Sequence, residues 1–181
     1  CSFWFIILKK LIPITRRTPD QILSELENSK LAFSFSLFGA YRYQNPLPWD
    51  TDVDLVLRSE EIEKIDQEAL IAKFKQKGFE IYYSYRSGAY RIERNNAHGD
   101  LLIFRNYSGT MKRTGLNSYY FYLSLRQHSF PADSIQPPLE TVEFCGIKMM
   151  APRGGLEFQK IHYGNDWYTE KKPKGCPNLG T

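Results

Sequence analysis

The residues of this chain most suited to chemistry are three aspartates at alternate positions. Asp50, Asp52 and Asp54 are followed directly by an apolar run at residues 55–57. Alternate side chains of an extended strand share a face, so the spacing predicts three neighbouring carboxylates with Val53 facing the other way. Like charges this close repel unless solvent or a cation relieves them. The row predicts a site for Mg²⁺ or Mn²⁺, which prefer oxygen ligands; an acidic turn that opens a strand is the alternative.

The elements that must position these aspartates begin with two predicted helices. One should start at Thr18-Pro19, whose cap and first helical residue are typical of a helix N-terminus, and end near Asn28. The other should follow the acidic strand, with Ser59 as its cap and Gly78 as its end. Both carry an apolar stripe, so both are expected to pack on a sheet.

The rest of the chain is rich in β-forming residues separated by turn residues. Strands are predicted at residues 79–85, 89–93, 100–104 and 119–123, a strand pair at residues 143–150, and a last helix at residues 153–163 that Gly164 stops. Beyond Pro131 the chain reads as loop until residue 143. The predicted fold class is therefore α+β, a mixed β-sheet with packed helices.

Composition bounds the class of protein. The chain has 181 residues, of which 42% are hydrophobic and 15% aromatic, values typical of one folded domain with a proper core. Its formal net charge of +4 is too small to argue for nucleic acid or an anionic membrane as a partner. The cysteines Cys1, Cys145 and Cys176 form no CxxC pair, so no zinc site is expected. One Cys145–Cys176 disulfide stays open.

The two ends of the chain are expected to lie outside the folded domain. Residues 1–17 form an apolar and then basic segment, either a buried strand or the remnant of a membrane anchor, and residues 171–181 form a basic tail. The domain itself is predicted at residues 18–170. If an anchor preceded the domain, the basic residues near the N-terminus would favour a cytoplasmic domain, whereas the glycosylation sequon Asn106-Tyr107-Ser108 is typical of secretory compartments.

Several separated motifs together carry a resemblance to the LicD and fukutin family. They are Leu37-Phe38-Gly39-Ala40-Tyr41-Arg42, the stretch Pro48-Trp49-Asp50-Thr51-Asp52-Val53-Asp54, Asp100 opening a later strand, and a closing segment from Phe130-Pro131 to Asn165-Asp166-Trp167. Their order and gaps also resemble the family, over about residues 31–170. The resemblance implies a nucleotidyltransferase-like fold. It also implies transfer of an alcohol phosphate, phosphocholine or ribitol phosphate, from a CDP-activated donor to a glycan or glycoprotein acceptor.

The resemblance assigns roles to the acidic residues. Asp52, Asp54 and Asp100 would hold the metal ion, and Asp50 would ligate it or accept the proton of the attacking hydroxyl. Carboxylates from two strands suit this chemistry, because metal ions can clamp both the attacking and the leaving oxygen of a phosphoryl transfer. A turn residue after His98-Gly99 is the alternative for Asp100. The implied location is the lumen of the Golgi or another secretory membrane, with any anchoring outside this chain.

Phosphate binding is predicted at residues outside the acidic stretch. Ser36 matches a small hydroxyl position of the family, and Arg42 matches its arginine, which could hold a phosphate bidentately or pair with an aspartate. Lys160 could add a phosphate contact or be plain solvated charge. Tyr163 and Trp167 could stack on a ring of the donor, but aromatics at a helix end are expected in the core.

One departure from the family pattern favours a different function. Phe33-Ser34-Phe35-Ser36 stands where the family has a glycine-containing turn, at which backbone N–H groups can approach phosphate. The chain could therefore be a catalytically silent module that holds a glycan or a partner enzyme. A third hypothesis is another nucleotidyl transfer, because a fold alone does not fix the chemistry.

Overall fold

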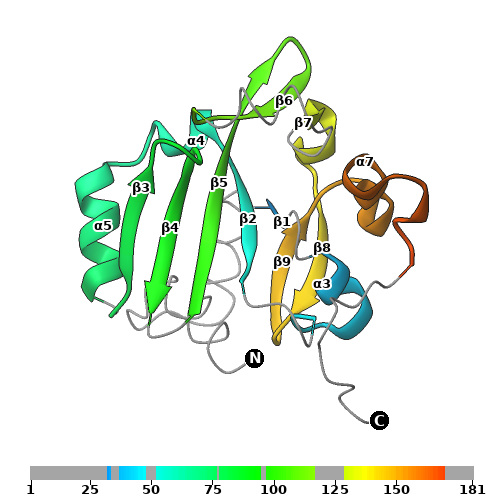
Figure 1. Ribbon diagram of the computed structural model, residues 1–181, viewed down its shortest axis with the longest axis horizontal. Helices are drawn as coiled ribbons and strands as arrows, with labels where there is room; N and C mark the ends of the chain where they lie inside the picture. The colour runs from blue at the N-terminus through cyan, green and yellow to red at the C-terminus, as the bar shows by residue number, and fades with distance from the viewer. Residues whose placement is uncertain are drawn as a thin grey trace.

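The structure is a computed structural model that describes residues 32–33, 37–47, 52–76, 78–94, 97–116 and 129–169. Within these ranges the central feature is a nine-stranded sheet of order β3-β4-β5-β2-β1-β9-β8, with β6 pairing with β5 and β7 (Figure 1). The strands are β1 (Ala32–Phe33), β2 (Asp54–Arg58), β3 (Glu80–Ser84), β4 (Ala89–Arg94), β5 (Ala97–Tyr107), β6 (Thr110–Arg113), β7 (Ser129–Pro131), β8 (Glu140–Phe144) and β9 (Ile147–Ala151). The helices are α3 (Leu37–Tyr43), α4 (Ser59–Ile62), α5 (Gln67–Gln76) and α7 (Lys160–Tyr163), with 3-10 helices η2 (Ala132–Ile135), η3 (Gly155–Gln159) and η4 (Gly164–Asp166).

The sheet contains both parallel and antiparallel pairs. Strand β2 runs parallel to β5, and β1 runs parallel to β9, whereas the other neighbouring pairs are antiparallel. Parallel strands need a long connection, which α4, α5, β3 and β4 supply between β2 and β5. Helix α5 packs against β3 at the edge of the sheet (Figure 1). The α+β prediction is confirmed, and the arrangement is consistent with a nucleotidyltransferase-like fold.

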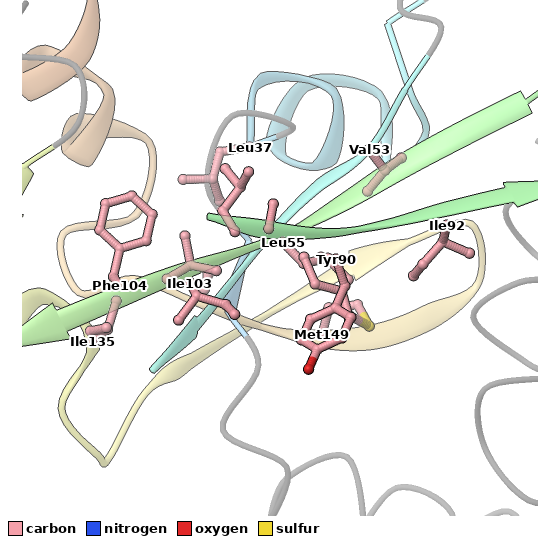
Figure 2. Packing of buried hydrophobic residues seen from close by; sticks show 14 of the residues in the cluster. Leu37, Val53, Leu55, Tyr90, Ile92, Ile103, Phe104, Ile135 and Met149 are labelled. Carbon is pink, nitrogen blue, oxygen red and sulfur yellow. The ribbon is translucent and has the colours of Figure 1, made fainter. Parts of the chain in front are cut away.

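The core surrounds the central strands β2 and β5. Leu55 and Leu57 lie on the face of β2 opposite to Asp54, as the alternation predicts, and each is 4% exposed. Val56 shares the face of Asp54 and is also buried, at 1% exposure, because both faces of this central strand are covered. Residues 101–104 of β5 are buried beside them. Figure 2 shows Leu55 and Ile103 within this packing.

A series of aromatic rings joins the C-terminal part of the domain to the sheet. The ring centroids of Phe104 and Phe130 are 4.9 Å apart, those of Phe130 and Phe158 are 5.2 Å apart, and those of Phe158 and His162 are 5.2 Å apart. These rings come from β5, β7, η3 and α7. Because burying an aromatic or aliphatic side chain contributes roughly 1.5–3 kcal/mol, this contact holds η3 and α7 on the sheet.

The helix predicted from Ser59 to Gly78 is two helices, because Asp66 begins a new one. Its Oδ1 accepts hydrogen bonds from the backbone N–H groups of Glu68 and Ala69, at 2.9 and 3.2 Å. Such a bond is the usual side-chain cap of a helix N-terminus. Ser59 is instead the first residue of α4, which has no side-chain cap, so the capping role predicted for Ser59 is wrong.

The strand predictions are confirmed in part. Residues 79–85, 89–93 and 143–150 contain β3, β4 and the hairpin β8–β9. Strand β5 begins at Ala97, so Asp100 is its fourth residue, and the predictions that it opens the strand or follows a turn are wrong. Strands β6 and β7 were not expected, and β8 begins at Glu140, within a stretch predicted as loop. The predicted strand at residues 119–123 lies outside the described residues.

The last predicted helix is confirmed in position, but only part of it is α-helical. Its first part is the 3-10 helix η3, and only residues 160–163 are α-helical. Gly164 follows with a φ of 71°, yet the chain continues directly as η4. The helix predicted from residue 18 to 28 and the apolar N-terminal segment lie outside the described residues. None of the described helices is long and apolar enough to cross a membrane.

The loop that leads from α3 toward the acidic stretch is fastened to the β8–β9 turn. The backbone N–H of Cys145 donates to the carbonyl of Gln44 at 2.7 Å, and both residues have positive φ angles. Cys145 is also disulfide-bonded. The structure describes neither of the other two cysteines, so the pairing with Cys176 stays a prediction.

Gly39 on α3 provides a test of how tightly this loop packs. A Cβ atom at Gly39 would lie 2.5 Å from the Asn45 carbonyl oxygen and 3.0 Å from the Leu47 nitrogen. Gly39→Ala is therefore expected to lower the free energy of unfolding by about 1–3 kcal/mol, because backbone would have to move. Urea unfolding followed by circular dichroism measures this. Gln76→Ala, at an exposed site of α5, is the control, and an equal effect of the two changes would contradict the packing.

Candidate metal and phosphate site

Two of the predicted metal ligands are direct neighbours across parallel strands. Asp54 of β2 is paired in register with Asp100 of β5, and the N–H of Asp100 donates to the Val53 carbonyl at 3.1 Å. Neighbouring strands lie about 4.8 Å apart, and residues paired in register direct their side chains to the same face. The structure therefore places the Asp54 and Asp100 carboxylates side by side. Asp100 is well covered, with a side-chain exposure of 16%.

A second pair of side chains comes earlier in each segment, just before β2 and near the start of β5. Asp52 precedes Asp54 by two residues and His98 precedes Asp100 by two. The Nε2 atom of His98 lies 3.6 Å from Oδ2 of Asp52, with both side chains partly exposed. The pair Asp52–His98 thus lies two residues before the pair Asp54–Asp100 in both segments.

Arg91 of β4 lies beside Asp100, on the side opposite to Asp54. It is paired in register with Asp100, its Nε donates to Oδ1 at 3.0 Å, and its second guanidinium nitrogen donates to Oδ2 at 3.3 Å. This is the bidentate geometry in which a planar guanidinium matches a carboxylate. The hydrogen bonds and charge of Asp100 raise the pKa of Arg91 above its usual value, so the arginine remains charged.

Arg113 of β6 adds a second positive charge to the carboxylates. Its Nε donates to the Ser87 carbonyl at 2.9 Å. Burial lowers the pKa of Arg113, and the charges of Asp54 and Asp100 act in the opposite direction, because a nearby negative charge favours the cation. The Arg113 guanidinium therefore interacts electrostatically with both carboxylates. Two arginine side chains thus offset part of the negative charge in this region.

The donor set fits a hard divalent ion in chemistry. Asp54 and Asp100 are partners across two parallel strands and Asp52 lies beside His98, and carboxylate oxygens are the ligands that Mg²⁺ and Mn²⁺ prefer. Among the described residues, however, no three His, Cys, Asp or Glu side chains are grouped closely enough to hold a metal ion. The orientation of Asp100 accounts for part of this result, because both of its oxygens bond to Arg91.

The remaining predicted ligands have different placements. Asp50 and Ser36 lie outside the described residues, so their roles stay predictions. Arg42 lies on α3, donates a hydrogen bond to the Tyr168 carbonyl and stands 4.8 Å above the ring of Phe38. The hydrogen bond joins α3 to the chain beyond η4, and the ring contact lies within α3. The predicted phosphate contact of Arg42 is neither supported nor opposed by them.

Lys160 and the neighbouring aromatic residues occupy a different part of the domain. Lys160 forms an ion pair with Glu157 at 3.3 Å and lies 5.2 Å from the ring centre of Trp167. Figure 1 shows its helix α7 beyond β8 and β9, away from the start of β2. Tyr163 is 43% exposed, so the expectation that it belongs to the core is wrong; Trp167 is half-buried.

Sequence reasoning missed His98, Arg91 and Arg113, although signals for them were present. Alternation alone places His98 on the face of Asp100 once residue 98 is assigned to the strand. Two asparagines at residues 95–96 separate the paired ends of β4 and β5, and two-residue Asn turns typically join hairpin strands. That hairpin sets Arg91 opposite Asp100. Likewise Ser108-Gly109 indicates a hairpin that would have predicted β6 and Arg113.

The Arg91–Asp100 ion pair predicts whether replacing Asp100 stabilises or destabilises the protein. Asp100→Asn removes the two-point pairing with Arg91 and should lower the free energy of unfolding by about 1 kcal/mol in metal-free buffer. If carboxylate repulsion dominated instead, the same change would stabilise the protein. Urea unfolding with EDTA present distinguishes these outcomes. Glu63→Gln is the control: it breaks the more exposed Arg105–Glu63 pair and should cost less.

Comparison with known proteins identifies the family. A model of the LicD/FKTN/FKRP nucleotidyltransferase domain matches residues 34–154. Two curated proteins, each named ribitol 5-phosphate transferase FKRP, from Mus musculus and Homo sapiens, are 29% identical to the chain over 159 residues. The match covers 82% of this chain but 31% of each relative, so the chain spans about a third of their length. The carboxylates lie within the matched range, and the chain belongs to the LicD/FKTN/FKRP nucleotidyltransferase family.

Proposed function

We propose that this domain is a metal-dependent phosphotransferase that moves an alcohol phosphate from a CDP-activated donor to a glycan acceptor. Ribitol phosphate is the favoured group because the curated relatives are named ribitol 5-phosphate transferases. Phosphocholine is the other candidate that the family resemblance implies. The observation that carries the proposal is the alignment of Asp54 with Asp100, which brings carboxylates from two strands to one location.

The proposed reaction is a displacement at the phosphorus that bears the alcohol. The acceptor hydroxyl oxygen bonds to this phosphorus, the bond to the bridging oxygen breaks, and CMP leaves with that oxygen. The hydroxyl proton passes to a carboxylate or to solvent. Such a transfer requires mainly positioning and charge neutralisation, because the protein has little covalent chemistry to perform. A site with carboxylates and arginines in contact suits these two tasks.

The residues of the site divide these tasks. Asp52, Asp54 and Asp100 would hold Mg²⁺ or Mn²⁺, which when bound would neutralise the oxygens of the diphosphate. His98 beside Asp52 would orient that carboxylate, in the way that hydrogen-bonded neighbours of metal ligands commonly do. Arg113 reduces the negative charge that an anionic donor would meet. Asp50 would be a further ligand or the proton acceptor.

One observation favours the alternative of a catalytically silent module that holds a glycan or a partner enzyme. Both oxygens of Asp100 are engaged by Arg91, so this carboxylate is neutralised without any ion. In a silent module the aspartates would serve only the fold. The two hypotheses therefore differ in what replacement of an aspartate does to activity at constant stability.

A secretory location is proposed together with the transferase function. Cys145 is disulfide-bonded, and structural disulfides persist in oxidising compartments. The sequon Asn106-Tyr107-Ser108 spans the exposed end of β5 and the start of the turn to β6, where a glycan could be attached. Both features support the lumen of the Golgi or another secretory compartment. Any membrane anchoring would come from segments outside the described residues.

Transfer activity tests the proposed function. Asp54→Asn and Asp100→Asn should each reduce the transfer of ribitol phosphate from CDP-ribitol by about a hundredfold or more, the usual effect of losing one positioned electrostatic group. Mass spectrometry of the acceptor and of released CMP measures this in the intact protein. Glu63→Gln should leave the rate within about twofold, because it alters only an exposed ion pair. Wild-type rates in both aspartate variants would contradict the proposal.

Thiol labelling tests the proposed oxidising location. Cys145 in protein isolated from the secretory pathway should resist iodoacetamide until a reductant is added, because its sulfur is already bonded. Peptide mass spectrometry reports the labelled fraction, and it should also identify the partner cysteine. Complete labelling of Cys145 without reductant, in protein protected from reduction during isolation, would contradict the prediction.

A further inference from the structure

Arg91 holds the carboxylate of Asp100 at the position where the proposed function needs a metal ligand. Its two donors contact both carboxylate oxygens, at 3.0 and 3.3 Å. One guanidinium charge therefore neutralises Asp100 in the absence of any ion. A divalent cation approaching Asp100 would meet this charge at close range, and like charges that close oppose each other.

The Arg91–Asp100 ion pair is suited to an exchange of partners because its two side chains differ in burial. The Arg91 side chain is 41% exposed, whereas that of Asp100 is 16% exposed. Neighbouring Tyr82, paired in register with Arg91 on β3, is 46% exposed, so the guanidinium borders an open part of the sheet. Pairs with an exposed partner contribute about 1 kcal/mol or less. The guanidinium can therefore leave the carboxylate at small cost while Asp100 stays in place.

The chemistry of the guanidinium indicates where it would go. Its planar fork matches a phosphate as well as it matches a carboxylate. The proposed donor brings a diphosphate to the Asp54–Asp100 pair. Arg91 lies beside this pair because it is paired in register with Asp100. A phosphate bound there would offer Arg91 a replacement partner within reach of its side chain.

We propose that Arg91 is an exchangeable counter-ion: it neutralises Asp100 when no metal is bound, and it turns to a phosphate of the donor when a divalent cation takes Asp100. This inference rests on the proposed function and deepens it, because it makes Arg91 a donor-binding residue. It also links the two ligands. A metal ion on Asp100 frees Arg91 to bind the donor phosphate, and the phosphate draws Arg91 away from Asp100. The nucleotide should therefore raise the affinity for metal, and metal should raise the affinity for the nucleotide by the same factor.

Calorimetric titration of Mn²⁺ into the intact protein, with and without CDP, tests this exchange. In wild-type protein CDP should raise the Mn²⁺ affinity by about tenfold, the size expected for one adjacent charge. Arg91→Gln should bind Mn²⁺ about tenfold more tightly than wild type without CDP, and CDP should then raise the affinity by a smaller factor than it does in wild type. Arg91→Lys keeps the charge without the fork, so its Mn²⁺ affinity without CDP should stay near the wild-type value.

The controls separate this inference from the function on which it rests. Arg105→Gln removes an arginine of similar exposure from the distant Glu63 pair and should leave Mn²⁺ binding unchanged. Asp100→Asn should abolish binding. Equal Mn²⁺ affinity in Arg91→Gln and wild type, or weaker affinity in the variant, would overturn the exchange while leaving the proposed function intact. Absence of Mn²⁺ binding by wild type and Arg91→Gln alike, with and without CDP, would overturn both.

Discussion

The parallel pairing of β2 with β5 is the constraint on which the site depends. It sets Asp54 opposite Asp100 through a ladder of backbone hydrogen bonds, and a shift of one residue in register would turn one of the carboxylates to the other face. The buried residues of both strands fix this register, because Leu55, Val56 and Leu57 each fill a covered position. The hydrophobic core therefore determines the spacing of charges that lie outside it.

Charge balance is the second determinant of the site. Several carboxylates at one location are tolerated because Arg91 and Arg113 stand beside them, one in a two-point hydrogen bond and one partly withdrawn from solvent. In this arrangement Asp100 is neutralised before any ligand arrives. The arrangement also means that binding of a cation or of a phosphate requires a rearrangement of existing ion pairs rather than the filling of a preformed cage. The proposed function and the proposed exchange of Arg91 both follow from this property.

Sequence alone predicted the fold class, the family and several strands, because these depend on local patterns. Runs of β-forming residues bounded by turn residues indicated β3, β4 and the β8–β9 hairpin, and the spaced motifs indicated the family. The break before α5 was missed because the apolar stripe from Ile62 to Phe74 reads as continuous, although Asp66 within it is a capping residue. The partners of the carboxylates were missed for a different reason. His98, Arg91 and Arg113 meet the aspartates through strand register, which short hairpin turns determine and which apolar periodicity does not reveal.

A crystal structure of the protein soaked with Mn²⁺ and CDP would test the central claim most directly, because Mn²⁺ can be located by its anomalous scattering. The account predicts a peak within coordinating distance of both Asp54 and Asp100, with the phosphates of CDP beside it. Bound CDP with no manganese at these carboxylates, or manganese held by other residues, would contradict the claim that two parallel strands build a metal site.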